Sequence, residues 1–344
     1  MRLAVTPLLV ALLPLSVVLG GCTGAAPAPV YSGNTTPTIT QDTGSGDTDT
    51  DTDSDTDTDT DTDTDTGATF AAAVTDATFR DAVDVAVSGT TLYAAGFDDA
   101  GNAEVVSVPV SGGALTVLAS GSPLVQPSGI AISDDGSMLY VSDVASGSGA
   151  TNGGVYAIPV GGGTPAEIGT AGVIDLPGDV TVTGASTGYV SGFTADGTAA
   201  IFSVNLGNGA ATVAVSGGVL VDPMQLQASS DGSMLYVLDS LGAGGGKASV
   251  LAYDTSDFSE VTLYDGFSTN FPGGLAVSAD DATVYFSTIL DPSLYGVSAD
   301  GAAVQEFDTL GLLELPAGVC SDATAVYVVD SSSLAGADIY SLSF

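Results

Sequence analysis

Oxygen-bearing side chains are the residues of this sequence whose types and spacing could do chemistry. The chain of 344 residues contains 41 Asp and Glu residues and no His, and its basic residues are Arg2, Arg80 and Lys247. Histidine is the usual general base and the commonest metal ligand in proteins. Any metal site in this chain must therefore be built from oxygen ligands, which suit Ca²⁺ because this ion takes about six to eight of them.

Acidic and amide residues near the starts of short β runs are the candidate metal ligands. If these runs form a closed ring, the starts of the innermost runs meet around a central channel. The candidates are Asp84, Asp179, Asp222, Asn270 and Glu314. Aspartate also recurs at the ends of apolar runs, at one shared repeat position that favours backbone capping over metal binding: Asp143, Asp239 and Asp330.

The remaining residues do not favour covalent catalysis. Serine is abundant, but a nucleophilic serine needs a neighbouring base, and the sequence has neither a His nor a well-placed Lys. Cys320 lies between Val319 and Ser321 in an apolar run, where a cysteine is usually small buried filler. The sequence predicts no catalytic residue, and whether the chain is an enzyme stays open.

A repeat marked by tyrosines must position the candidate ligands. Its period lies between 42 and 50 residues, and its tyrosines are Tyr93, Tyr140, Tyr189, Tyr236, Tyr285 and Tyr327. Another β run precedes each tyrosine across a tight turn such as residues 133–137, and two further runs follow in most repeats. Four strands per repeat at this period are typical of a β-propeller blade.

The last repeat contains only three candidate strands before the sequence stops at Phe344. Residues 69–75 are predicted to supply the missing strand and thereby close the ring, which removes free sheet edges. The sequence therefore predicts an all-β fold over residues 69–344, a six-bladed β-propeller with four-stranded antiparallel blades.

The first residues have the pattern of an export signal. Arg2 precedes an apolar run from Leu3 to Leu19, which is too short and too interrupted by proline for a comfortable membrane span. The run ends in Gly20-Gly21-Cys22, which resembles a lipobox; the alternative is ordinary cleavage beside a chance cysteine. Residues 1–21 are therefore predicted to be a lipoprotein signal peptide, with Cys22 as the lipidation site. The expected location is the cell envelope, at the outer membrane or cell surface, with the membrane as a partner through the lipid.

Residues 22–68 are predicted to form a disordered acidic linker. An Asp-Thr alternation runs from Asp47 to Thr66 without a basic or apolar residue, so the segment cannot bury enough surface to offset its ordering entropy. The formal net charge of the chain is −38. No nucleic-acid partner is expected, and anionic membrane surfaces are predicted to be poor partners, because binding to phosphate depends on Lys and Arg.

The segment Pro127–Asp143 resembles the repeats of NHL and YVTN-type propellers and of the gluconolactonase-like family, and the likeness recurs with decay over roughly residues 82–344. Gluconolactonase-like enzymes hold a divalent metal through Glu, Asn and Asp at the channel, a set that does not align here residue by residue. Two hypotheses stay open. The first is a surface-anchored binding or scaffold module without catalysis, whose protein, glycan or small-molecule ligand is not identified. The alternative is a Ca²⁺-dependent, lactonase-like hydrolase that uses an acidic channel mouth, with Ca²⁺ as its cofactor.

Overall fold

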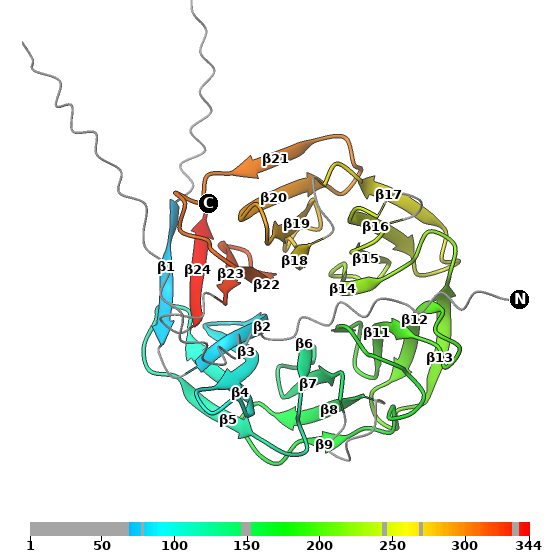
Figure 1. The fold of residues 1–344 in the computed structure, drawn as a ribbon, viewed down its shortest axis with the longest axis horizontal. Helices are drawn as coiled ribbons and strands as arrows, with labels where there is room; N and C mark the ends of the chain where they lie inside the picture. Colours follow the sequence, from blue (N-terminus) through cyan, green and yellow to red (C-terminus); the bar gives the residue numbers. More distant parts are fainter. Residues whose placement is uncertain (1–68, 77–78, 146–152, 243–245, 268–270, 332–336) are drawn as a thin grey trace, which may run out of the picture. The chain divides into compact units, whose positions relative to one another are not determined.

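The computed structural model describes residues 69–344 except 77–78, 146–152, 243–245, 268–270 and 332–336. The described residues form six antiparallel sheets of four strands each, arranged around a central axis (Figure 1). The predicted all-β, six-bladed propeller is therefore confirmed. The predicted signal peptide, Cys22 and the linker lie outside the described residues. No helix among the described residues has the length and apolar composition that a membrane crossing requires.

Each blade is built from an innermost strand at the channel to an outermost strand at the rim. The innermost strands are β2 (Phe79–Ser88), β6 (Pro127–Ile132), β10 (Val180–Val182), β14 (Pro223–Ala228), β18 (Pro272–Val277) and β22 (Pro316–Ser321). The second strands are β3 (Thr91–Asp98), β7 (Met138–Asp143), β11 (Thr187–Phe193), β15 (Met234–Asp239), β19 (Thr283–Thr288) and β23 (Ala325–Asp330). The third strands are β4 (Ala103–Pro109), β8 (Gly154–Pro159), β12 (Ala199–Asn205), β16 (Ser249–Asp254), β20 (Ser293–Ser298) and β24 (Ala337–Ser343). The outermost strands are β5 (Thr116–Ser120), β9 (Ala166–Glu167), β13 (Ala211–Ser216), β17 (Glu260–Tyr264), β21 (Val304–Phe307) and β1 (Thr69–Asp76). Blades are numbered here from β2, so that β1 belongs to blade 6.

Blade 6 joins the two ends of the described chain. Strand β1 pairs antiparallel with β24, from Thr69 opposite Ser343 to Asp76 opposite Ala337 (Figure 1). Strand β2, which follows β1, begins blade 1 and packs beside β22 of blade 6. The ring is therefore closed by a strand from the N-terminal side of the repeats.

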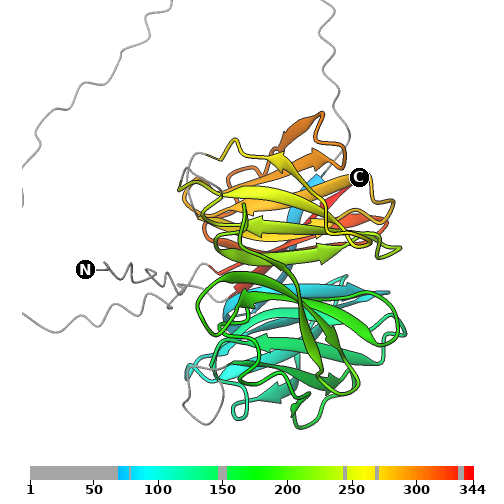
Figure 2. The same ribbon diagram turned by 90° about the vertical axis from the view of Figure 1, so that its right-hand side faces the viewer.

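The hydrophobic core lies between the blades. Six apolar clusters each combine side chains of two neighbouring blades, so the sheets pack face to face around the ring (Figure 2). In the cluster between blades 1 and 2, for example, Val105, Leu139 and Val141 are completely buried. All six repeat tyrosines are buried in this packing. Fully burying one Val or Leu side chain stabilises the fold by about 1.5 to 3 kcal/mol.

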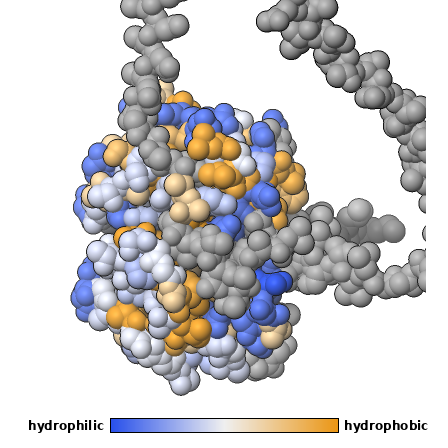
Figure 3. Space-filling view, turned by 90° about the vertical axis from the view of Figure 1, so that its left-hand side faces the viewer, coloured by the Kyte–Doolittle hydropathy of each residue, from blue (hydrophilic) through white to orange (hydrophobic). Residues whose placement is uncertain are grey.

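Antiparallel pairing gives the propeller two distinct faces. One face, called the loop face here, carries the loops that lead into the innermost strands and the loops between second and third strands. The opposite face, called the turn face, carries the tight turns between first and second strands and between third and fourth strands. Hydrophilic and hydrophobic patches are intermixed on the side of the propeller that carries β1 (Figure 3).

Candidate functional site

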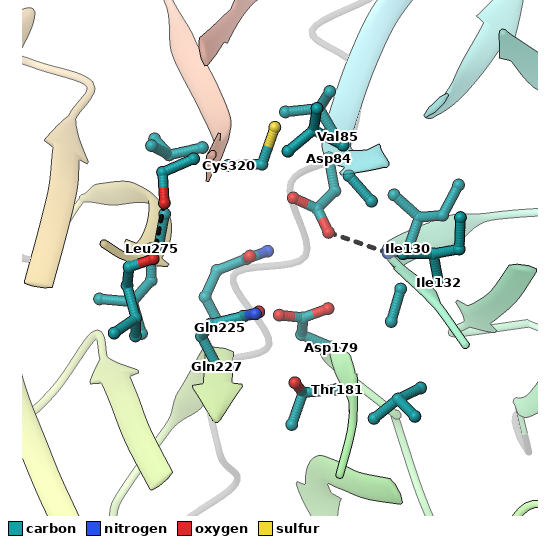
Figure 4. Close-up of a pocket in the computed structure, with 18 residues that line it drawn as sticks. Asp84, Val85, Ile130, Ile132, Asp179, Thr181, Gln225, Gln227, Leu275 and Cys320 are labelled. Atoms are coloured by element: carbon teal, nitrogen blue, oxygen red, sulfur yellow. Dashed lines mark hydrogen bonds between the residues drawn. The ribbon is translucent and has the colours of Figure 1, made fainter. Parts of the chain in front are cut away.

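The innermost strands of all six blades enclose a cavity of about 120 Å³ on the channel axis (Figure 4). Its lining is mostly aliphatic, and its carboxyl and amide side chains are Asp84, Asp179, Gln225 and Gln227. Three of them, Asp84, Asp179 and Gln225, occupy the same repeat position in blades 1, 3 and 4, and glycine occupies it in the other blades. The site is thus one ring of equivalent positions, filled by polar side chains in half of the blades.

Two of the three glycines of this ring make room for the aspartates. A Cβ on Gly129 of blade 2 would lie 2.1 Å from Oδ1 of Asp179, and a Cβ on Gly318 of blade 6 would lie 2.4 Å from Oδ1 of Asp84. Real Cβ atoms do not approach oxygen this closely, because such a contact is strongly repulsive. Each aspartate is therefore seated against the bare backbone of a neighbouring blade.

Both buried aspartates tie their own blade to the next one. Asp84 Oδ2 accepts the Ile130 N–H at 2.8 Å, and Asp179 Oδ2 accepts the Leu226 N–H at 3.0 Å. Ile130 and Leu226 occupy the same repeat position of the following blade. Asp179 Oδ1 also accepts the Val180 N–H, at 2.6 Å. The carboxyls satisfy buried backbone donors of the innermost strands, which would otherwise lack partners.

Burial changes the ionisation of this pair. Desolvation raises the pKa of Asp84 to about 7, against the lowering effect of the backbone hydrogen bonds from Ile130 and Val85. Desolvation also raises the pKa of Asp179 well above its usual range, and the nearby charge of Asp84 raises it further. Both carboxyls therefore hold protons at pH values where an exposed aspartate is ionised.

Gln225 and Gln227 supply the amide groups of the cavity. Gln225 is 7 % exposed, and its side chain borders the cavity. Figure 4 shows the side chains of Gln225 and Gln227 directed into the channel, together with Asp84 and Asp179. Amide groups that border a cavity can be satisfied by water or by a ligand there.

The structure does not bring the five predicted metal ligands together at one place. Asp84 and Asp179 line the cavity, whereas Asp222 and Glu314 do not. Asp222 is half-buried and accepts a hydrogen bond from the Ser240 hydroxyl, and the Glu314 side chain is exposed. Asn270 lies outside the described residues. Within the described ranges, no three His, Cys, Asp or Glu side chains come together in a way that could hold a metal ion.

The aspartates at the ends of second strands cap backbone, which confirms that prediction. Asp143 is completely buried and accepts the N–H groups of Val125 at 2.8 Å and Gln126 at 3.0 Å, in the loop that leads into its own blade. Asp239 binds Val221 and Asp222 in the same way, and Asp330 binds Glu314 and Leu315. These carboxyls hold the loops of the loop face in place.

Aspartates of the turn face lie in a different setting. Asp135 accepts hydrogen bonds from the hydroxyls of Ser133 at 2.7 Å and Ser137 at 2.6 Å, within one tight turn. These bonds, the one from Ser137 first, lower the pKa of Asp135 to about 2. Asp231 occupies the equivalent turn of blade 4, where bonds from Ser233 and Ser229 lower its pKa to about 2 as well.

Sequence reasoning missed Gln225 and Gln227 as members of the site. Their signal was present, because Gln225 stands at the repeat position of Asp84 and Asp179, and Gln227 stands two residues later, where Thr181 and Cys320 stand in their blades. Alignment of the six innermost strands on this position would have identified the whole ring. The expectation that acidic residues beside it also reach the channel led to Asp222 and Glu314 instead.

No protein-family model and no curated protein sequence matches this chain. Solved structures do match in fold. A gluconolactonase from Xanthomonas campestris aligns with a TM-score of 0.58 and 13% identity, over 80% of this chain and 89% of its own. A calcium-binding protein, regucalcin, from Agrobacterium tumefaciens aligns with a TM-score of 0.57 and 14% identity, over 79% of this chain and 93% of its own. A nidogen/laminin complex matches with a TM-score of 0.54 and 14% identity, over 66% of this chain and 82% of the matched chain. The fold is a six-bladed β-propeller, and the first two neighbours fit the propeller families that the sequence resembles.

Proposed function

We propose that the protein is a lipid-anchored binding module of the cell envelope, whose propeller holds a partner and carries no catalysis of its own. One observation carries this proposal: the buried carboxyls of the channel and of the loop face accept backbone N–H groups. Asp84 and Asp179 bind the next blade, and Asp143 binds the loop into its own blade. Carboxyls used in this way build a rigid surface, and rigid propellers offer such surfaces to partners.

The anchor is proposed from the sequence around Cys22. Diacylglyceryl attachment to its thiol, with a further acyl chain, would hold the protein stably at a membrane, because each buried CH₂ contributes about 0.8 kcal/mol. The acidic linker would keep the propeller away from the lipid surface, with the outer membrane or cell surface as the location. Metabolic labelling with an alkyne fatty acid should mark the wild type and leave Cys22→Ser unmarked. A label that persists in Cys22→Ser would contradict the anchor.

Binding without catalysis is tested by cross-linking in the native cell. A photoreactive residue is placed singly at Val221 on the loop face, at Asp280 on the turn face and at Val213 on an outermost strand. A discrete, saturable adduct from at least one position, together with no turnover of lactones, is the expected result. Absence of adducts from all three positions, combined with metal-dependent lactone hydrolysis, would overturn the proposal.

A second candidate is a Ca²⁺-dependent hydrolase of the lactonase kind, and the carboxyl and amide side chains that line one cavity favour it. The donors fit Ca²⁺ in kind: Asp84 and Asp179 would supply carboxylate oxygens, and Gln225 and Gln227 would supply amide oxygens. A bound Ca²⁺ would polarise a lactone carbonyl. The chain's own residues would hold the ion and orient the substrate, and both carboxyls would first have to release protons.

Calorimetric titration of the full chain with Ca²⁺, read beside a thermal shift, tests this second candidate. A cavity site predicts saturable binding that is lost in Asp179→Asn and retained in the matched turn-face variant Asp231→Asn. If Ca²⁺-dependent lactone turnover disappears in Asp179→Asn alone, the hydrolase replaces the binding module as the function. Equal Ca²⁺ binding by both variants would remove the cavity site.

A further inference from the structure

The loop of residues 308–315 exposes three leucines on the loop face. It connects β21 of blade 5 to β22 of blade 6, and the exposed fractions are 65% for Leu310, 37% for Leu312 and 43% for Leu315. Leu313, in the same loop, is 4% exposed and packs into the cluster between blades 5 and 6. One leucine therefore fixes the loop to the core, and the other three present apolar surface to solvent. Residues 308–315 are called the leucine loop below.

Leu310 is unfavourable for the isolated propeller in two ways. Its side chain is the most exposed of the large apolar residues in the described chain, and its backbone has a φ of 55°. A non-glycine residue in this left-handed region is strained, and Gly or Asn would fit there with less strain. Neither packing nor backbone geometry therefore explains a leucine at this position, whereas contact with a partner would.

The leucine loop is held by hydrogen bonds along its length. The Leu310 N–H binds Asp308 Oδ1 at 2.8 Å, and the Leu312 N–H binds the Thr309 carbonyl at 3.0 Å. The buried Asp330 accepts the Leu315 N–H, and the Leu315 carbonyl accepts the Ser331 N–H at 2.9 Å. A loop fixed in this way loses little conformational entropy when a partner binds to it.

Charge restricts the kind of partner that fits. Asp308 and Glu314 are exposed at the two ends of the leucine loop. From Thr69 onward the chain has 30 acidic residues against Arg80 and Lys247, and Arg80 is paired with Asp99 in blade 1. A second copy of this chain, its own Asp-Thr linker and an anionic membrane all carry the wrong charge for close approach. A segment that combines apolar and basic side chains is complementary to both features.

We propose that the leucine loop docks a basic amphipathic segment of a partner protein, with leucines of the loop contacting its apolar face and Asp308 and Glu314 facing its Lys or Arg residues. This inference rests on the proposed binding function and names the class of partner. Apolar anchors surrounded by charges of one sign give affinity through the anchors and partner choice through the charges.

The probe is a synthetic helical peptide with leucines on one face and lysines on the other, carrying a photoreactive group. Two control peptides accompany it, one with the same composition in scrambled order and one with Glu in place of Lys. The full chain carrying Cys22→Ser is used in solution. Because the linker also attracts cations, the readout is the cross-linked residue identified by mass spectrometry, and adducts within residues 308–315 from the amphipathic peptide alone are expected.

Leu310→Gly with Leu312→Ser should weaken this adduct by roughly tenfold or more, as the loss of two apolar contacts implies. The glycine relieves the backbone at position 310, so the melting temperature should stay equal or rise, which separates docking from folding. The matched control is Val117→Ser, which removes an apolar residue of 55% exposure from β5 of blade 1 and should change nothing.

Asp308→Asn with Glu314→Gln should weaken the adduct at low salt and leave it close to the wild-type level at high salt, so that its dependence on salt concentration falls. Equal adducts from scrambled and amphipathic peptides would overturn the inference, as would binding to anionic vesicles or dimerisation that requires the same leucines. If the native partner cross-links from the turn face or an outermost strand only, the binding module stands and the leucine loop is not its docking site.

Discussion

The two faces of the propeller place the same residue type, aspartate, in opposite physical settings. On the turn face, Asp135 and Asp231 are exposed, and hydroxyl donors within their own turns lower each pKa to about 2. Toward the loop face and the channel, Asp143 and Asp84 are buried, and desolvation raises the pKa of Asp84 to about 7. The same side chain therefore has a lowered pKa where it is exposed and hydrogen-bonded, and a raised pKa where it is buried away from solvent.

The partners of these aspartates differ in sequence distance. Asp135 binds groups two residues away, so its turn is determined locally. Asp143 reaches Gln126 across 17 residues, and Asp84 reaches Ile130 in the next blade across 46 residues. The turn face can form as soon as a hairpin forms, whereas the loop face depends on the assembled ring. Substitutions on the two faces should separate local from global contributions to stability.

The largest difference should come from removing a buried cap. Asp143→Ala leaves the N–H groups of Val125, Gln126 and Ala145 without their acceptor, and such buried donors are costly. We expect the free energy of unfolding in urea to fall by about 4 kcal/mol, if roughly 1 to 2 kcal/mol is lost per donor. The control Asp135→Ala on the turn face should lose much less. Equal losses would show that burial does not distinguish the faces.

A steric change beside the channel should be next in size. Gly129→Ala places a methyl group against the Asp179 carboxyl, and relief requires the innermost strands to move. We expect a loss of about 1 to 3 kcal/mol in the free energy of unfolding, as for other overpacked sites. The control is Gly89→Asn in the turn between β2 and β3, where φ is 58° and no atom lies within 4 Å of the added Cβ. That variant should fold with nearly wild-type stability, and an equal loss there would contradict the close packing of the channel.

The channel carboxyl should make stability depend on pH. In the folded state the pKa of Asp84 is about 7, above its ordinary value of 3.8, so the folded protein binds the proton more tightly than the unfolded chain. Stability from this group is present below pH 4 and is lost as pH rises toward 7. Each pKa unit corresponds to about 1.4 kcal/mol, so Asp84→Asn should exceed the wild type in stability by a few kcal/mol at pH 8 and match it near pH 4. Urea unfolding of both proteins at pH 4 and pH 8, in a chelating buffer, measures this difference in stability. A difference that does not change with pH would contradict the raised pKa of Asp84.

The smallest expected effect lies on the turn face and is a change in titration. Because hydroxyl and backbone donors lower the pKa of Asp135 to about 2, its contribution is present above the unfolded value and is lost only as pH falls through about 2. Carboxyl carbon shifts in an NMR titration should give midpoints near 2 for Asp135 and Asp231. Midpoints near 4 would mean that the serine bonds do not persist in solution.

The six-bladed repeat could be predicted from the sequence because its signals depend on residues that are close together in the chain. The tyrosine spacing and turns such as residues 133–137 predicted six blades, and the structure has them. Asp84 and Asp179 were correctly expected at the channel. The placement of Asp222 and Glu314 could not be read in the same way, since it depends on how far each loop rises from its strand. That height is set by bonds such as the one that the Asp222 N–H donates to the Asp239 carboxylate.

The leucine loop shows a second limit of sequence reasoning. Leu310, Leu312, Leu313 and Leu315 lie close together in the sequence, and only packing against blade 6 reveals that Leu313 alone is buried. The left-handed backbone of Leu310 also has no sequence signal, because glycine would be expected at such a position.

The pairing of β1 with β24 sets an order of events during synthesis. A ribosome makes Thr69 long before Ser343, so the first strand of the ring waits for the last one while five blades are completed between them. Until then β1 is a solitary strand with unpaired N–H and C=O groups, and β24 lacks its outer neighbour. We expect this final pairing to be the slow step of folding, and a nascent chain stalled before β24 to be the species most prone to pair with other chains.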